Sequence, residues 1–430
     1  MQSTPSKPPS HSRRRYAPPP LTRGDGETFR GSVVLEEFDG PAGALLWKSL
    51  RTMLIWTEAD PHERPRLFLP GAKRRRLAAL RAAELDGALL KPLRVLARAL
   101  DRSASISPEP LAKACRQLSE WADQQGALAT ALAFMQVAAL LVPDDAEAAY
   151  LTGRLARRRA EYARAETWFH QAITVARQNA DWRAYALAFI GLGNLHLQRG
   201  NFPAARKSHT TALKTARKHG LREIEGMASH DLFVIADESN QVREAEVHAA
   251  NALHAYGAGH PRLPNLAHDL ACLWMNQGQF ARALSVIRAA LSHIRQPRDR
   301  SLALGSLGRA AGAAGDAAGF DAAWNQFWQA SETDTSAEGA AQALLALAQG
   351  AASLHDWDRA EHAAGRALEI ASLRKESQVQ ILAEAVLESI RHGRLARASV
   401  HQLPEHPTEE ADALAGEFVA ALEDLQVEPV

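Results

Sequence analysis

Histidine and aspartate stand side by side twice, at the same place in two related stretches of the chain. The triplets are His230-Asp231-Leu232 and His268-Asp269-Leu270. A carboxylate beside an imidazole can bind a peptide backbone or a basic side chain, and an imidazole titrates near neutral pH. The same pair can instead hold two neighbouring helices together, and both interpretations stay open. No third ligand or nucleophile stands in a fixed relation to either pair, so neither zinc binding nor acid–base catalysis is expected.

Sequence motifs of catalysis are missing from the rest of the chain. There is no phosphate-binding GxxxxGK[ST] loop, no HExxH zinc motif, no GxSxG nucleophile turn and no dinucleotide-binding GxGxxG. The 17 histidines are scattered. The two cysteines, Cys115 and Cys272, follow no metal spacing, which favours free thiols in a reducing compartment. We therefore expect a protein that is not an enzyme, with no catalytic residues, no metal and no cofactor.

The elements that position these residues lie between two ends of the chain that differ in charge. Composition is 46% hydrophobic and 23% charged, which is enough to fold. Residues 1–110 carry 19 Lys and Arg against 12 Asp and Glu, whereas residues 404–430 carry eight acidic residues and no basic one. Such asymmetry predicts two ends with different contacts. No apolar run is long enough for a membrane helix or a signal peptide, so a cytoplasmic protein without membrane insertion is expected.

One pattern recurs between the two ends. In the stretch 146–172, Gly153 lies in a first amphipathic segment, Tyr162 follows a turn, and Ala165 and Phe169 lie in a second segment. The alanine recurs at Ala131, Ala165, Ala205, Ala245, Ala283, Ala360 and Ala398. The turn between the segments often holds glycine, at Gly126, Gly200, Gly278, Gly315 and Gly393. Glycine favours the positive φ with which many helices end.

This pattern resembles the tetratricopeptide repeat, which has a small eighth residue, alanine at position twenty and an aromatic residue four later. The resemblance covers about two-thirds of the chain and implies about eight repeats. It predicts an all-α fold, a right-handed superhelical solenoid of helix-turn-helix repeats with a small helical N-terminal module. We expect a disordered basic tail at 1–27, the helical module at 28–110, the repeat array at 111–403 and an acidic amphipathic helix within 404–430.

The resemblance also implies a ligand groove. In this family the first helix of each repeat lines a concave face, and positions two, five, six, nine and twelve contact the ligand. Those positions hold Arg116, Tyr150, Arg154, Arg157, Asn194, His230, Asp231, Asp237, Asn265, His268, Asp269 and Arg309. The first end of this set is basic and its middle is acidic, which predicts a ligand of opposite, graded charge.

The expected function is a scaffold or adaptor that binds a peptide or protein segment in this groove. The alternative is a regulator of transcription or signalling, in which ligand binding to the repeats controls the basic N-terminal module. The residues Lys73, Arg74, Arg75 and Arg76 form a basic cluster on a predicted helix. This cluster is either a site for nucleic acid or an acidic peptide, or a solvated face that can dock the acidic C-terminal helix.

The C-terminal segment has the pattern of one amphipathic helix. Thr408 can cap it, and Glu409 and Glu410 suit the positive end of its dipole. Apolar residues at Leu414 and Phe418 recur on one face. The alternatives stay open: the helix covers the apolar end of the last repeat, or it occupies the groove or is offered to a partner as a motif.

Overall fold

Helices make up the regular structure of the chain. The computed structural model describes residues 33–101, 106–331, 339–391 and 408–425. No strand occurs within these ranges, so the predicted all-α fold is confirmed for them. The helices form two compact units, Met1–Ile224 and Glu225–Val430. The expected basic tail at 1–27 lies outside the described residues, and so do Gly393 and Ala398 of the last predicted repeat.

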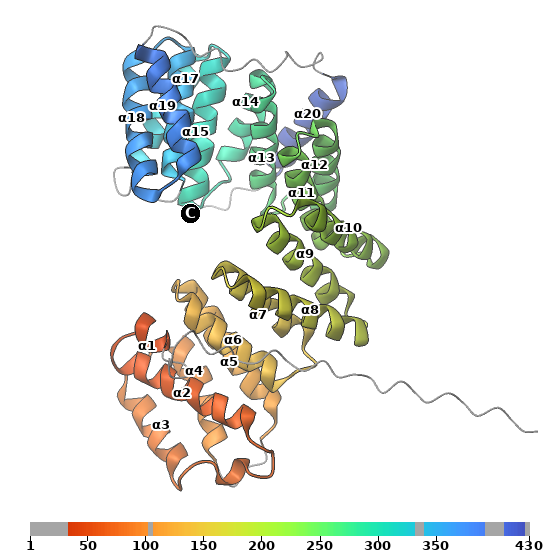
Figure 1. Cartoon of the computed structure of the whole chain (residues 1–430), viewed down its shortest axis with the longest axis vertical. Coiled ribbons are helices and arrows are strands. Elements are labelled where there is room, and N and C mark those ends of the chain that lie inside the picture. The colour runs from red at the N-terminus through yellow and green to blue at the C-terminus, as the bar shows by residue number, and fades with distance from the viewer. Residues whose placement is uncertain (1–32, 102–105, 332–338, 392–407, 426–430) are drawn as a thin grey trace, which may run out of the picture. The chain divides into compact units, whose positions relative to one another are not determined.

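The first unit begins with four helices that precede the repeats (Figure 1). They are α1 (Val33–Glu37), α2 (Gly40–Glu58), α3 (Ala72–Ala82) and α4 (Gly87–Leu96), with 3-10 turns at Arg64–Arg66 and Ala97–Leu100. Three helix pairs follow: α5 (Pro108–Gln124) and α6 (Leu128–Leu141), α7 (Ala146–Arg158) and α8 (Tyr162–Gln178), α9 (Trp182–Gln198) and α10 (Phe202–His219).

The N-terminal helices pack against the first helix pair. The carboxylate of Glu37 accepts hydrogen bonds from the backbone N–H groups of Ala129 (2.9 Å) and Thr130 (2.7 Å). These groups lie in the first turn of α6, where helical N–H groups have no partner within the helix. The Phe38 ring lies 5.0 Å from the Trp121 ring, centroid to centroid. Glu37 and Phe38 therefore join the N-terminal helices to α5 and α6.

The second unit continues the helix pairs. They are α11 (Arg222–Glu238) and α12 (Val242–Tyr256), α13 (Leu263–Asn276) and α14 (Phe280–Leu291), α15 (Pro297–Ala313) and α16 (Ala317–Ser331), α17 (Ala340–Ser353) and α18 (Trp357–Arg374). The single helices α19 (Ser377–Arg391) and α20 (Glu409–Glu423) complete the described part. The whole chain was expected to divide at about residues 27, 110 and 403, and that division stays a prediction.

Alanine and glycine determine how the two helices of each pair meet. The six described alanines of the recurring position, from Ala131 to Ala360, are fully buried. A Cβ placed on Gly153 would lie 2.7 Å from the Phe169 ring of the paired helix. Between the helices, Gly126 and Gly278 have φ values of 78° and 75°, in the region that glycine adopts without strain. The described array therefore consists of tetratricopeptide-like helical repeats.

The backbones of α15 and α17 come into direct contact. A Cβ on Gly350 of α17 would lie 2.4 Å from the carbonyl oxygen of Gly308 on α15. A Cβ on Gly312 would lie 2.2 Å from the carbonyl oxygen of Gly350, and one on Gly305 would lie 2.6 Å from that of Ala343. Glycine at these places lets the first helices of two neighbouring repeats touch without intervening side chains.

The helix α20 packs on α14, α12 and α13 (Figure 1). Phe418 and Leu422 are fully buried there. Nε and Nη2 of Arg282 on α14 donate to Oδ1 of Asp412 at 2.8 Å and 2.7 Å. The Arg282 guanidinium also lies over the Trp274 ring, 5.4 Å from its centroid. The predicted helix is present, but it packs mainly on the second helices α12 and α14 and not on the last described repeat. Neither the expected cover of the last repeat nor a place in the groove is therefore found, and a role as a motif for a partner stays a prediction.

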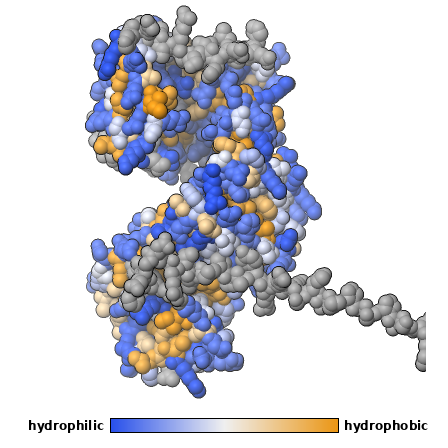
Figure 2. Space-filling view, in the orientation of Figure 1, coloured by the Kyte–Doolittle hydropathy of each residue, from blue (hydrophilic) through white to orange (hydrophobic). Residues whose placement is uncertain are grey.

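The last described repeat keeps apolar side chains at the surface. Leu373 is 79% exposed and Ile381 is 66% exposed, and Figure 2 shows apolar residues at the surface of this part of the chain. The apolar face of α20 packs on α12 and α14 and does not cover these exposed side chains. None of the described helices is long and apolar enough to cross a membrane.

Candidate functional site

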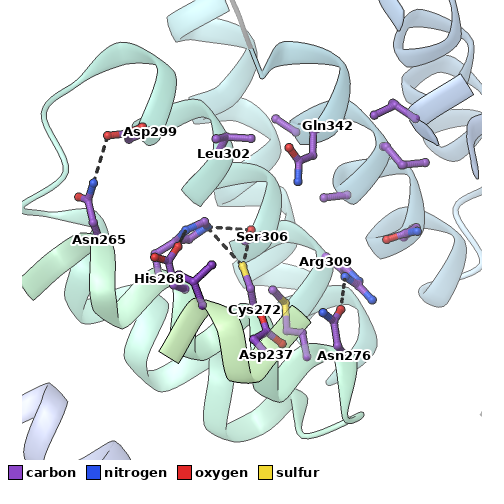
Figure 3. A pocket seen from close by; sticks show the side chains of 18 of the residues that line it. Asp237, Asn265, His268, Cys272, Asn276, Asp299, Leu302, Ser306, Arg309 and Gln342 are labelled. Carbon is purple, nitrogen blue, oxygen red and sulfur yellow. Dashed lines mark hydrogen bonds and ion pairs between the residues drawn. The ribbon is translucent and has the colours of Figure 1, made fainter. Parts of the chain in front are cut away.

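A cavity of about 720 Å³ lies in the second unit, along the first helices of its repeats. Its lining comes from α11, α13, α15, α17 and α19, and Figure 3 shows part of it from close by. Helix α13 contributes Asn265, His268, Asp269, Cys272 and Asn276. Spacings of three and four residues place side chains on one face of a helix. The sequence periodicity thus directs one face of each first helix into the cavity.

Two histidines and one aspartate meet in this cavity. Nε2 of His230 lies 2.9 Å from Oδ2 of Asp269, which joins α11 to α13. Nδ1 of His268 lies 3.7 Å from Oδ1 of the same aspartate. Nε2 of His268 lies 3.0 Å from the Ser306 hydroxyl on α15 and 3.7 Å from Sγ of Cys272. A polar network therefore links three successive first helices, and it contains three of the four side chains of the two His-Asp pairs.

The network changes the pKa values of Asp269 and His268. Burial opposes ionisation of Asp269, but hydrogen bonds from His230 and His268 outweigh it and lower the pKa of Asp269 to about 2. Burial also opposes the charge on His268, but Cys272 and Asp269 outweigh it and raise the pKa of His268 to about 10. At neutral pH the cluster therefore contains a carboxylate and an imidazolium, which attract each other.

We expect the second unit to lose stability as the pH rises above neutral. The folded pKa of His268 is raised above its ordinary value of 6.5, so its contribution is complete below 6.5 and is lost as the pH approaches about 10. The folded pKa of Asp269 is lowered, so its contribution is complete above 3.8 and is lost as the pH falls toward about 2. Urea unfolding of wild type and His268→Gln at about pH 6 and about pH 9.5 measures the first effect.

Other groups titrate in the same alkaline range, so the difference between the two proteins is the informative quantity. The His268→Gln protein lacks the imidazolium and should show the smaller loss of stability between the two pH values. Equal losses in both proteins would contradict the assignment of a raised pKa to His268.

Amide side chains line much of the remaining cavity wall. Nδ2 of Asn265 donates to Oδ2 of Asp299 at 3.3 Å, and Oδ1 of Asn276 accepts from Nη1 of Arg309 at 3.4 Å (Figure 3). Gln342, Gln349 and Gln378 add three more amides from α17 and α19. An amide side chain donates and accepts hydrogen bonds at once, so this wall can pair with groups of both kinds.

The predicted groove residues of the second unit are mostly found at this cavity. His230, Asp237, Asn265, His268, Asp269 and Arg309 line it. Asp231 is partly buried on α11 but does not belong to the lining. The cavity lining therefore includes both members of the second His-Asp pair and only the histidine of the first.

The predicted groove residues of the first unit have different surroundings. Arg116 forms ion pairs with Asp145 (3.4 Å) and Glu147 (3.0 Å). Tyr150 is 9% exposed and packs against the Phe169 ring at 6.3 Å between centroids. Arg154 is exposed, whereas Arg157 and Asn194 are partly buried. A ligand role for these five residues stays a prediction, and Tyr150 is largely a packing residue.

The basic cluster on α3 is divided among several contacts. Nζ of Lys73 lies 2.6 Å from a carboxylate oxygen of Asp101. Nη1 of Arg76 donates to the Ser49 hydroxyl of α2 at 3.0 Å, and burial lowers the pKa of Arg76. Arg74 and Arg75 are exposed. A binding role of this cluster stays a prediction, with Arg74 and Arg75 as its most accessible members.

Eight polar lining residues were not among the predicted site residues: Glu238, Asn276, Asp299 and Gln378 stand outside the ligand-contact positions of the repeats, and the other four stand at such positions. These four are Cys272, Ser306, Gln342 and Gln349. Cys272 and Gln349 stand at the ninth position of their repeats, Ser306 at a sixth and Gln342 at a second. The rule that selected the predicted residues would have found all four, had it been extended through repeats five to seven. Among the described residues, no group of three or more acidic, His or Cys side chains could hold a metal ion.

Known proteins offer only distant likenesses. No family model matches the chain, and no curated protein matches it. Its structure is similar to the Cut9-Hcn1 hetero-tetramer of the APC/C (16% identity, TM-score 0.45, 83% of this chain and 56% of that one). It is also similar to a tetratricopeptide repeat protein from Parabacteroides merdae (14%, 0.43, 64% and 98%) and to a Rap protein complexed with competence and sporulation factor (11%, 0.36, 82% and 98%).

Proposed function

We propose that this protein is a non-catalytic scaffold that holds an extended peptide or protein segment in the cavity along α11, α13, α15, α17 and α19. The observation that carries this proposal is the row of amide and charged side chains that successive first helices direct into one cavity of about 720 Å³. That volume lies within the range of about 300–1,000 Å³ typical of ligand sites. The partner is then a protein or peptide segment, which binds along the first helices of these repeats.

Amide side chains suit a peptide backbone. An extended peptide presents N–H donors and C=O acceptors in alternation, and each Asn or Gln amide can satisfy one of each. Asn265 comes from α13, and Gln342 and Gln349 come from α17, so one chain running across the cavity could meet all three. Leu302 and Leu345 supply apolar contacts between these polar groups. Many small contacts of this kind support binding of a segment rather than of one small group.

The geometry of the cavity argues against catalysis by Cys272. Nε2 of His268 faces the Ser306 hydroxyl at 3.0 Å and lies farther, 3.7 Å, from Sγ of Cys272. The lining residues near this thiol lie inside helices, where the backbone N–H groups already bond within the helix. Within the described part of the chain, no free backbone donors are therefore arranged around Cys272 to stabilise an oxyanion, which acyl transfer requires.

The regulatory alternative has no observation of its own in the described residues. Two of the four basic residues on α3, Lys73 and Arg76, contact neighbouring residues of the first unit. Binding in the second unit accounts for the cavity without a role for these residues.

Selection of peptides on the full chain tests the proposal. A displayed library of random linear peptides of about twelve residues should yield binders. A selected synthetic peptide should slow alkylation of Cys272 by iodoacetamide severalfold, because Cys272 lines the cavity. Cys115 is the internal control: it is fully buried, and burial raises its pKa, so it should stay unlabelled with or without peptide.

Variants locate the binding. Gln349→Ala should weaken the selected peptide about fivefold or more, because it removes a lining amide. Arg154→Glu in the first unit should leave affinity unchanged if the segment lies wholly in the second unit. A library that yields no binder, or binders that leave the alkylation of Cys272 unchanged, would contradict the proposal.

A further inference from the structure

The cavity contains an acidic corner that the fold leaves unpaired. The carboxylate of Asp237 has no hydrogen bond or ion pair within the part of the chain that the structure describes, and neither has that of its neighbour Glu238. Burial raises the pKa of Asp237, and repulsion by Glu238 and Asp269 raises it further. A carboxylate in this position costs free energy that a nearby cation would recover.

The same cavity contains an unpaired cation. Arg309 donates from Nη1 to the Asn276 amide oxygen at 3.4 Å, and no carboxylate of the described residues forms an ion pair with it. Burial lowers the pKa of Arg309, which Cys272 only partly opposes. A guanidinium presents several donors in one plane and binds a carboxylate with two of them. Arg309 therefore offers a place for an anionic group.

The other two carboxylates of the cavity lining each have a hydrogen-bond partner. Asp269 is engaged by His230 at 2.9 Å and by His268 at 3.7 Å, and Asp299 accepts from Asn265 at 3.3 Å. Elsewhere in this unit, the buried Arg282 forms an ion pair with Asp412. Among the described lining residues, Asp237 and Glu238 on α11 are thus the carboxylates without a hydrogen bond or ion pair, and Arg309 on α15 has no ion pair.

We propose that the segment bound in this cavity is amphoteric: it places a lysine, arginine or amino-terminal cation at Asp237 and Glu238, and a carboxylate at Arg309. This inference rests on the proposed function, since it names the chemistry of the same ligand. This ligand differs from the one expected from the sequence, whose charge would change gradually along the whole array. Here the ligand must carry both a positive and a negative group within the second unit. Charge complementarity of this kind determines selectivity and the direction in which a segment lies.

Parallel selections with charge variants test the inference. The probe is the library of random linear peptides, displayed against the full-length wild type, Asp237→Asn and Arg309→Gln. Wild type should enrich peptides that carry at least one basic and one acidic residue. Asp237→Asn should lose the enrichment of basic residues and keep that of acidic ones, and Arg309→Gln should do the reverse. Asp358→Asn and Arg366→Gln, which change charges on α18 outside the cavity, should reproduce the wild-type selection.

Affinities of one selected synthetic peptide sharpen the test. Arg309→Gln should weaken the peptide at least about tenfold, Arg309→Lys less, and Arg309→Gln should have little effect on the peptide whose acidic residue is replaced by glutamine. Unchanged thermal unfolding of each variant shows that folding is intact. Binders without any charge preference would overturn the amphoteric ligand while the proposed function stands. A library without binders to any protein would overturn both.

Discussion

Gly350→Ala is expected to destabilise the second unit by about 2–3 kcal/mol, although alanine is the better helix former. The added Cβ would lie 2.4 Å from the Gly308 carbonyl oxygen and 3.1 Å from Cα of Arg309. Both neighbours are backbone atoms of α15, so no side chain can rotate away and the two helices must separate. The separation would also move Arg309 and Gln349, which line the cavity from α15 and α17.

Urea unfolding followed by far-UV circular dichroism measures this loss. Gly365→Ala on α18 is the matched control, because a Cβ at Gly365 meets no atom within 4 Å. That variant should be more stable than wild type by about 0.5–1 kcal/mol, the ordinary gain of alanine over glycine in a helix. If Gly350→Ala were also neutral or stabilising, the close approach of α15 and α17 would be contradicted. Weakened peptide binding by Gly350→Ala alone would further link this contact to the cavity.

Phe418→Ala is expected to release α20 from α12 and α14, at a cost of about 3–5 kcal/mol. Phe418 is fully buried and is the largest of the apolar side chains by which α20 packs on the rest of the unit, Leu414 and Leu422 among them. The ion pair of Asp412 with Arg282 cannot replace this burial, because the Asp412 side chain is 64% exposed and its attraction is screened by water.

Hydrogen exchange of the backbone amides measures the release. In Phe418→Ala the amides of α20 should exchange at nearly the rate of an unfolded segment, while those of α7 and α8 in the first unit keep their protection. Glu423→Ala, which removes an exposed side chain from the same helix, should leave the exchange unchanged. Protection of α20 that persists in Phe418→Ala would show that α20 does not depend on this packing.

The repeats could be predicted from the sequence because their packing is local. Ala165 and Phe169 belong to a helix that packs against the helix just before it, so the contact recurs at a constant spacing along the chain. Gly126 and Gly278 mark where consecutive helices turn, which is again a property of adjacent residues. The same periodicity placed His268, Asp269 and Arg309 on the lining of one cavity.

Contacts between distant residues were decided by the tertiary structure. The apolar stripe of α20 predicted a helix that must bury one face, but a stripe fits many surfaces. Its position on α14 depends on Arg282, which is 130 residues from Asp412 in the sequence. Likewise Glu37 caps α6 across 92 residues. A one-dimensional pattern contains no information on such pairs, because the distance between their atoms depends on every helix between them.

The charges of the cavity show the same division. The sequence by itself determined that His230, Asp237 and Arg309 stand at repeat positions whose side chains are expected to face the groove. Only the tertiary structure decided that Asp269 is engaged by two histidines, whereas Asp237 and Arg309 have no ion-pair partner in the described residues. The helical phase orients each side chain toward one face, but the electrostatic energy of a charge depends on its distance to every neighbour in space.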